Sequence, residues 1–284
     1  MQTPADRLKF LRERAPTIGS SDAAAILCES TYKTPGDVWR RITGRTPIDE
    51  TVSKAAERGH MLEAVVADWW AGATGHGICA DGMRKHPTYQ YLTANVDRWI
   101  PDLDLALECK TASGPAADDF GAEDTDEVPV PYYLQCLHQA VVCGINRVHL
   151  AVLIGGFAFE FRKYVLDFSP EIKSEYTATV VRWWREHVET DTCPPPVTLS
   201  DTRAMYPYDT GEPIVATEEA AEACERYVMA REAEKSAKAY KDEEAITIQS
   251  AMQDAPALLS IHGRELATWK TAKSGRRTFR VKGD

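Results

Sequence analysis

Paired cysteines are missing from the sequence. Seven cysteines are scattered along 284 residues, and no two of them form a CxxC pair: Cys28, Cys79, Cys109, Cys136, Cys143, Cys193 and Cys224. An odd number of unpaired cysteines argues against a disulfide framework and against a four-thiolate zinc or iron–sulfur site. We therefore expect reduced thiols that are mostly buried, as is usual for free cysteine.

Long apolar runs are also missing. The longest run, from Leu150 to Phe159, is about half of the roughly 20 residues that a membrane-spanning helix needs. The N-terminal stretch MQTPADRLKFLRERAP has no apolar segment of the kind that marks a secretion signal. We therefore expect no membrane partner and a cytoplasmic location.

Positive charge is scarce overall, because 33 Lys and Arg residues stand against 43 Asp and Glu residues, a net charge of −10. An acidic chain can bind nucleic acid only where its basic residues are concentrated locally. One such concentration lies between His262 and Asp284, and the opposite extreme is the acidic run from Asp118 to Glu127. The basic tail is therefore a candidate phosphate-contacting surface, with Lys273, Arg276 and Arg277 as candidate DNA contacts. A solvated hairpin is the alternative.

The composition, with 44% hydrophobic and 27% charged residues, is that of a globular protein with one large domain and room for an appendage. Hydrophobic periodicity and turn residues predict an order of helices and strands. Helices are expected at 4–14, 23–27, 55–72, 132–143, 170–189 and 217–254, and strands at 89–100, 103–111, 148–154 and 157–168, with short strands between 258 and 281. This order predicts an α/β or α+β domain over 1–192, followed by an appendage over 193–284 that consists of a long polar helix and a basic hairpin tail.

The predicted hairpin over 91–111 contains the most informative residues. If its turn is centred between Asp102 and Leu103, Asp97 lies opposite Glu108 with Cβ atoms about 5 Å apart. Lys110 shares that face, because side chains alternate along a strand. Two facing carboxylates repel each other unless a cation intervenes, and hard oxygen ligands suit Mg²⁺ or Mn²⁺. An exposed hairpin face with solvated charges is the alternative.

Two helices add polar residues of the same kind. Glu63 lies beside Leu62, near the apolar edge of the helix predicted over 55–72. Tyr132, Gln135 and Gln139 have the spacing i, i+3, i+7 and therefore share one helix face. Each of these features also fits an ordinary surface or core position.

Five motifs taken together resemble a known family. They are GSSDAAAIL at 19–27, GHMLE at 59–63, NVD at 95–97, LECK at 107–110 and YYLQ at 132–135. In this order they resemble the YqaJ-type viral recombinase domain, which is the phage lambda exonuclease branch of the PD-(D/E)xK nucleases. The resemblance covers about residues 10–190. It implies a restriction-endonuclease-like core, with a central mixed sheet flanked by helices.

The resemblance also implies a role for each motif residue. Asp97 and Glu108 would bind the metal together with the main-chain carbonyl of Cys109, and Lys110 would be the catalytic lysine. Glu63 would support a second metal or the water in its place, and Gln135 would orient the lysine or the nucleophilic water. The cofactor would be one or two Mg²⁺ ions per active site, with Mn²⁺ as a substitute.

At the N-terminus, Arg14 and Ser21 match the basic and hydroxyl residues that hold the 5′ phosphate of a duplex end in the family. For Ser21, a helix N-cap is an equal alternative. Two positions depart from the family: Arg98 follows Asp97 where a glycine is more usual, and Leu137 stands where relatives often carry a second glutamine.

The function that the resemblance implies is a Mg²⁺-dependent 5′→3′ exonuclease. It would digest one strand of linear double-stranded DNA and leave 3′ single-stranded tails for phage-type recombination, in the cytoplasm of a bacterial host. The implied partners are double-stranded DNA ends, further copies of the chain in a ring-shaped trimer, and a single-strand annealing protein. The alternatives are a structure-dependent or restriction-like endonuclease, and an inactive module that binds DNA ends.

Overall fold

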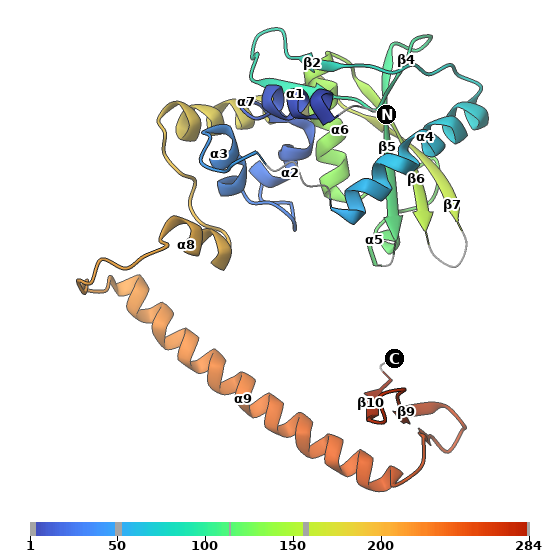
Figure 1. Ribbon diagram of the computed structural model, residues 1–284, viewed down its shortest axis with the longest axis vertical. Coiled ribbons are helices and arrows are strands. Elements are labelled where there is room, and N and C mark those ends of the chain that lie inside the picture. Colours follow the sequence, from blue (N-terminus) through green and yellow to red (C-terminus); the bar gives the residue numbers. More distant parts are fainter. Residues whose placement is uncertain (1–3, 49–52, 114, 156–158, 283–284) are drawn as a thin grey trace. The chain divides into compact units, whose positions relative to one another are not determined.

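A computed structural model describes residues 4–48, 53–113, 115–155 and 159–282 (Figure 1). The chain divides into two compact units, Met1–Tyr208 and Asp209–Asp284. The division falls later than the boundary predicted after residue 192, because helix α8 (Leu199–Met205) is bonded to the first unit. The Asp201 carboxylate of α8 accepts hydrogen bonds from Thr34 at 2.6 Å and from Arg40 at 3.1 Å.

A four-stranded mixed sheet forms the centre of the first unit. Its strands lie in the order β4 (Arg98–Ile100), β5 (Leu105–Ser113), β6 (Arg147–Gly155) and β7 (Glu160–Asp167). β5 and β6 are parallel, whereas the two outer pairs are antiparallel. The strands predicted at 148–154 and 157–168 are confirmed as β6 and β7, which pair with each other. Residues 156–158 lie outside the described residues.

Helices cover both faces of this sheet (Figure 1). Helix α4 (Lys54–Thr74) buries Val66 and Trp70 against Leu107 and Leu153 in one hydrophobic cluster. Helix α6 (Val130–Cys143) packs in a second cluster, which contains Ala106 and Ala112 of β5. Because Ala106 and Leu107 are consecutive, they point to opposite faces. The even-numbered residues of β5 therefore point toward α6.

A smaller sheet lies beside the main one, in the order β1 (Ile18–Gly19), β3 (Leu92–Asn95) and β2 (Met83–Lys85). The prediction of one strand over 89–100 is therefore wrong, since β3 and β4 belong to different sheets. The break falls at Asp97, whose carboxylate accepts a hydrogen bond from the Cys109 amide at 2.8 Å. A side chain that takes this amide replaces the main-chain partner that would have continued the ladder.

The remaining helices of the first unit pack around these sheets. They are α1 (Pro4–Arg14), α2 (Ala23–Ile26) after the short 3₁₀ turn η1 (Ser20–Asp22), α3 (Pro35–Ile42), α5 (Pro115–Asp118) and α7 (Pro170–Trp183). The helix predicted over 170–189 is confirmed, although its last turn, Trp184–Glu189, is a π-helix. Helix α3 was not predicted, although Thr34 and Asp37 form a capping box at its start.

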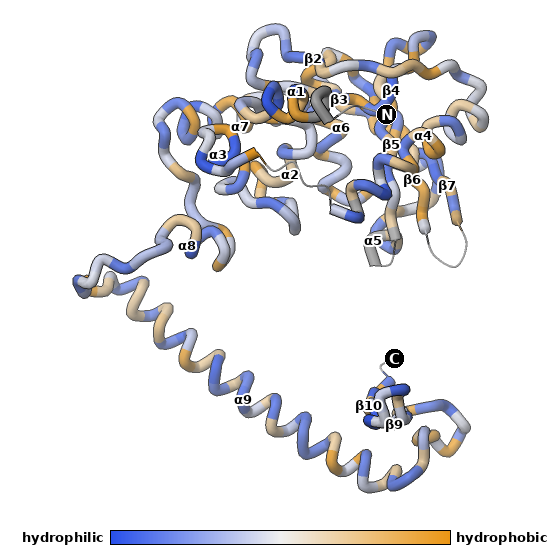
Figure 2. Tube along the Cα trace, in the orientation of Figure 1, coloured by the Kyte–Doolittle hydropathy of each residue, from blue (hydrophilic) through white to orange (hydrophobic). Residues whose placement is uncertain are grey.

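The second unit begins with the long helix α9 (Glu218–Met252), which contains 35 residues. At 1.5 Å per residue its length is about 50 Å. Polar and apolar residues are mixed along α9 without a continuous apolar stripe (Figure 2). Strands β8 (Ala257–Leu259), β9 (Glu265–Thr271) and β10 (Arg277–Val281) follow as an antiparallel sheet, in which β9 is central. Among the described residues, no helix is long and apolar enough to cross a membrane.

All seven cysteines are free thiols. The prediction that most of them are buried is wrong, because only Cys109 and Cys136 are buried, whereas Cys28, Cys79 and Cys224 are exposed. Burial raises the pKa of both buried thiols well above its usual range. They therefore remain protonated at neutral pH.

Candidate active site

The pairing of β4 with β5 follows the predicted register. Arg98 pairs with Leu107, and Ile100 pairs with Leu105. One step further along the same register places Asp97 opposite Glu108, where the Asp97 carboxylate binds the Cys109 amide. The hairpin therefore brings the two predicted carboxylates together.

Glu108 has hydrogen-bond or ion-pair contacts with three side chains of the site, and it is only 2% exposed. The ammonium of Lys110 lies 2.6 Å from its Oε1 atom. The amide of Gln135 donates to the same oxygen, and the amide of Gln139 donates to Oε2. Three donors thus hold one carboxylate, as expected for a buried ionised group.

Gln139 is a further member of this cluster, to which the sequence motifs assign no role, although it shares a helix face with Gln135. Leu137, at the position where relatives often carry a second glutamine, is instead buried in the hydrophobic core. The second amide that reaches Glu108 therefore comes from Gln139, and the i, i+4 spacing from Gln135 is the signal that could have identified it.

Burial and neighbouring charges shift the pKa values of Asp97 and Lys110. Burial and then the Glu108 charge raise the pKa of Asp97 well above its usual range. Burial lowers the pKa of Lys110, but the charges of Glu108 and Asp97 outweigh this effect and raise it above its ordinary value. The two carboxylates thus favour the protonated, positively charged form of Lys110.

A divalent cation would relieve the repulsion between Asp97 and Glu108. In the part of the chain that the structure describes, no three His, Cys, Asp or Glu side chains converge as a metal site. The chain thus offers two carboxylates and the main-chain carbonyl of Cys109. This oxygen-only donor set fits a hard cation that keeps several waters, and it does not fit a closed tetrahedral zinc site.

Glu63 reaches the same site from α4, but it already has a cationic partner. The Arg98 guanidinium donates to its carboxylate at 2.7 Å and also donates to the main-chain carbonyl of Asp97. His60 lies further away, at 3.9 Å. The unusual arginine after Asp97 therefore neutralises Glu63, and the role of Glu63 toward a second metal stays a prediction.

A second polar cluster surrounds the buried Asp22. Its carboxylate lies 2.7 Å from Arg41, 3.3 Å from Lys33 and 3.7 Å from Arg14. Burial raises the pKa of Asp22, but the charges of Arg41, Arg14 and Lys33 outweigh burial and hold this pKa below its usual range. The Arg14 guanidinium donates to the Ser21 hydroxyl.

The N-cap alternative for Ser21 is wrong. Gly19 caps the 3₁₀ turn, and Asp22 stands at the N-cap of α2. The Ser21 hydroxyl instead accepts a hydrogen bond from Arg14, so these two side chains lie together. The contact of these two residues with a 5′ phosphate stays a prediction.

One cavity of about 340 Å³ connects the two clusters. Its lining includes seven of the predicted site residues: Arg14, Ser21, Glu63, Asp97, Glu108, Lys110 and Gln135. Cys109 also lines it. The structure therefore brings all predicted site residues of the first unit into one place.

The acidic run at 118–127 has basic partners on β7. Lys163 lies 3.2 Å from Glu123 and 2.7 Å from Asp124. Arg162 donates to the main-chain carbonyls of Phe120 and Gly121. These contacts offset part of the negative charge of the loop, which would otherwise oppose the approach of DNA.

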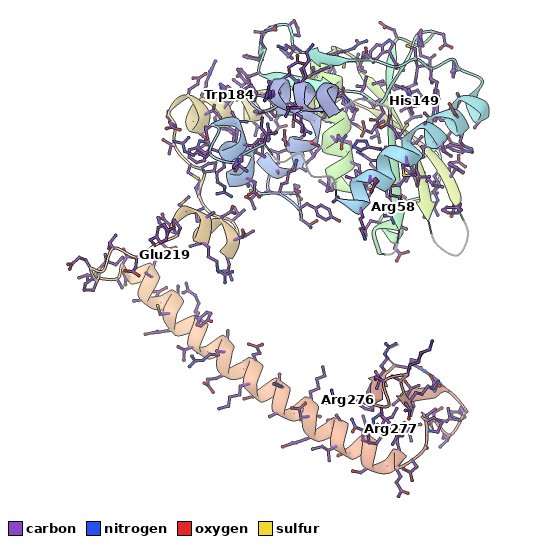
Figure 3. All side chains as sticks on the ribbon, viewed as in Figure 1. Arg58, His149, Trp184, Glu219, Arg276 and Arg277 are labelled. Atoms are coloured by element: carbon purple, nitrogen blue, oxygen red, sulfur yellow. The ribbon has the colours of Figure 1, made fainter. Side chains whose placement is uncertain are left out.

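The three basic residues predicted to contact DNA lie in the second unit, where Figure 3 labels Arg276 and Arg277. Arg277 has a structural role, because its guanidinium stacks on Trp269 and donates to the carbonyls of Trp269, Gln253 and Ala255. Lys273 and Arg276 are exposed. Contacts of the three residues with DNA stay predictions.

Comparison with known proteins finds a family match within the first unit. Residues 9–146 match the YqaJ-like viral recombinase domain, in agreement with the motifs and with the site just described. The match covers a little under half of the chain. The uncharacterised protein YqaJ of Bacillus subtilis strain 168 is 33% identical over 185 residues, which are 64% of this chain and 56% of that protein. The chain thus spans little more than half the length of this relative.

Solved structures resemble the first unit in fold. LHK-Exo in complex with dAMP has a TM-score of 0.51 at 14% identity, covering 63% of this chain and 91% of that one. The alkaline exonuclease LHK-Exo from Laribacter hongkongensis, in a second structure, has a TM-score of 0.48 at 14% identity, covering 63% and 93%. The predicted α+β core, a mixed sheet flanked by helices, is confirmed. Exonucleases of the PD-(D/E)xK type are generally metal-dependent.

Proposed function

We propose that this chain is a Mg²⁺-dependent deoxyribonuclease that digests one strand of linear double-stranded DNA in the 5′→3′ direction and leaves 3′ single-stranded tails. The observation that carries the proposal is one shared cavity. Asp97, Glu108 and Lys110 line it together with Arg14 and Ser21. A metal-binding carboxylate pair beside an anion-binding pair suits cleavage of a phosphodiester near a terminal phosphate.

The cofactor in this proposal is one or two Mg²⁺ ions, for which Mn²⁺ can substitute. Asp97, Glu108 and the main-chain carbonyl of Cys109 would hold the metal, and Glu63 is the further candidate ligand. A bound divalent cation polarises a phosphoryl oxygen and lowers the pKa of a coordinated water.

The chain's own residues orient and neutralise the reacting groups. The Lys110 ammonium is held by Glu108 and can orient the attacking water and stabilise negative charge on the phosphate. Gln135 and Gln139 fix the Glu108 carboxylate, so that its oxygens keep one direction. Arg14 and Ser21 would bind the 5′ phosphate, which would restrict cleavage to DNA ends.

A gel assay with Mg²⁺ tests this proposal. The substrates are a linear duplex labelled at either 5′ or 3′ end and a covalently closed circle. The proteins are the wild type, Lys110→Ala, and Lys238→Ala as a control at an exposed lysine of α9. We expect loss of the 5′ label from linear DNA alone, a decrease of at least about 100-fold for Lys110→Ala, as positioned charges of this kind provide, and no change for Lys238→Ala.

The other outcomes decide between the alternatives. Cutting of the closed circle would indicate the endonuclease. No cleavage of any substrate with Mg²⁺ or Mn²⁺ would contradict the enzyme and leave the DNA-end-binding module. A linear duplex with 5′ hydroxyl ends tests the anion site. The wild type should digest a 5′-phosphorylated duplex faster than the 5′-hydroxyl duplex, and Arg14→Ala should digest both at the same rate.

The proposal extends to the partners that the lambda exonuclease branch implies. We propose that copies of the chain form a ring-shaped trimer around double-stranded DNA and act with a single-strand annealing protein in the bacterial cytoplasm. Light scattering of the purified protein tests the trimer, since a monomeric mass at micromolar concentration would contradict it.

A further inference from the structure

The three-stranded sheet of the second unit has two chemically different faces. In β9 and β10, Trp269 pairs with Phe279, and Lys270 pairs with Thr278. Because side chains alternate along each strand, Trp269 and Phe279 share one face, and Lys270 and Thr278 share the other. The register thus assigns every residue of these strands to one face or the other.

The face with Trp269 packs inside the unit. Arg277 lies on it, stacks 3.8 Å from the Trp269 ring and donates to the carbonyls of Gln253 and Ala255 at the end of α9. Ala267, on the same face, is 1% exposed. Trp269 is therefore covered by Arg277, which is bonded to the end of α9, and Phe279 on the same face is half-buried.

The opposite face carries positive charge. Lys270, Arg280 and Thr278 lie on it within the strands, Lys282 follows directly after β10 and donates its amide to Leu266, and all four are exposed. We name these four residues the basic sheet face. Within the described residues, neither Lys270 nor Arg280 has a carboxylate partner, and Lys282 lies 3.7 Å from Glu265.

The charge of this sheet contrasts with the rest of its unit. Between residues 257 and 282, seven Lys and Arg residues stand against the single acidic residue Glu265. Residues 209–256, which include α9, have a net charge of −7. The positive charge is thus concentrated in the sheet, beside Lys273 and Arg276 in its turn, as the binding of a polyanion by an acidic chain requires.

We propose that the basic sheet face binds the phosphate backbone of duplex DNA. Lysine, arginine and threonine side chains are the usual donors to phosphate oxygens. Single-strand-binding surfaces combine positive charge with exposed aromatic rings on which bases stack. The basic sheet face has no aromatic residue, because Trp269 and Phe279 belong to the packed face. Backbone contacts without stacking favour duplex over single-stranded DNA.

The choice of DNA as the polyanion rests on the proposed function, but the binding does not require cleavage. The experiment therefore measures the affinity of the full-length protein for a covalently closed duplex circle in EDTA, across a range of salt concentrations. The circle has no ends, so the anion site at Arg14 contributes little. A failure of nuclease activity leaves this measurement unaffected.

Two triple variants with the same loss of charge are compared. The face variant is Lys270→Ala/Arg280→Ala/Lys282→Ala, and the control on exposed residues of α9 is Lys235→Ala/Lys238→Ala/Lys241→Ala. Each phosphate contact contributes about 0.9 to the slope of log K against log salt concentration, so the face variant should lose about 2.7 of it. We expect at least a tenfold weaker affinity, and no such loss in the control.

Three results would overturn the proposal. The first is a face variant with the affinity and salt slope of the wild type. The second is an equal loss in the α9 control, since net charge alone would then explain the binding. The third is a loss confined to single-stranded DNA in a parallel titration, which would contradict the assignment to duplex.

Discussion

Replacement of Gln139 by methionine separates the stabilising role of this residue from its positioning role. Gln139 is fully buried, and its amide nitrogen donates to Glu108 Oε2. Its amide oxygen is buried and, among the described residues, has no hydrogen-bond partner. Methionine has a similar length and no strongly polar atom, so Gln139→Met removes the bond and the unpaired oxygen together.

The two effects on stability oppose each other. A hydrogen bond to an ionised group contributes about 1.5–3 kcal/mol, and a buried unpaired polar group costs about 1–3 kcal/mol. We therefore expect the free energy of unfolding to change by no more than about 2 kcal/mol. For a domain of this size the melting temperature should shift by at most about 8 °C.

Activity should respond differently, because Glu108 Oε2 loses the donor that sets its direction. We expect kcat to fall at least about tenfold, equivalent to about 1.4 kcal/mol in the barrier. Gln135→Met is the comparison variant. Gln135 lines the cavity, and its replacement removes the amide that donates to the other carboxylate oxygen, Glu108 Oε1. Urea unfolding and Mg²⁺-dependent nucleotide release measure the two quantities. A loss of more than about 2 kcal/mol in stability at an unchanged rate would refute the positioning role.

Two further predictions concern stability and metal binding. Burial lowers the pKa of His138 to about 4 from 6.5, so the unfolded chain binds the proton more readily between these values. The free energy of unfolding should therefore fall by about 3 kcal/mol as pH decreases through this window. Urea unfolding measures it, and a wild-type profile no steeper than that of His138→Gln would contradict it. Arg98 already neutralises Glu63, so calorimetry with Ca²⁺ should find one cation per wild-type chain and two for Arg98→Ala. Two in the wild type would refute this reasoning.

Local sequence signals predicted most of the first unit correctly. The apolar spacing around Val66 predicted α4, and the proline and glycine flanks predicted α6. The turn after Ile100 predicted the register that places Asp97 opposite Glu108. These features depend on residues close together in the chain, where periodicity and turn chemistry act directly.

Other features depend on partners that are distant in the sequence. The strand predicted over 89–100 breaks at Asp97, because its carboxylate takes the amide of Cys109 twelve residues away. Asp201 of α8 bonds to Arg40 and thereby moves the unit boundary past the Pro194–Pro196 break. No local pattern contains either contact, so the sequence alone did not reveal these features.

The amino-acid sequence by itself determined which side chains are available for chemistry, and through strand alternation and helix periodicity it determined which of them share a face. The tertiary structure alone decided what each of them contacts. It gives Glu108 the amide of Gln139, pairs Glu63 with Arg98, and commits Arg277 to packing against Trp269. The physical reason is that the charge, pKa and accessibility of a side chain depend on burial and on groups brought close by folding, whatever their separation along the chain.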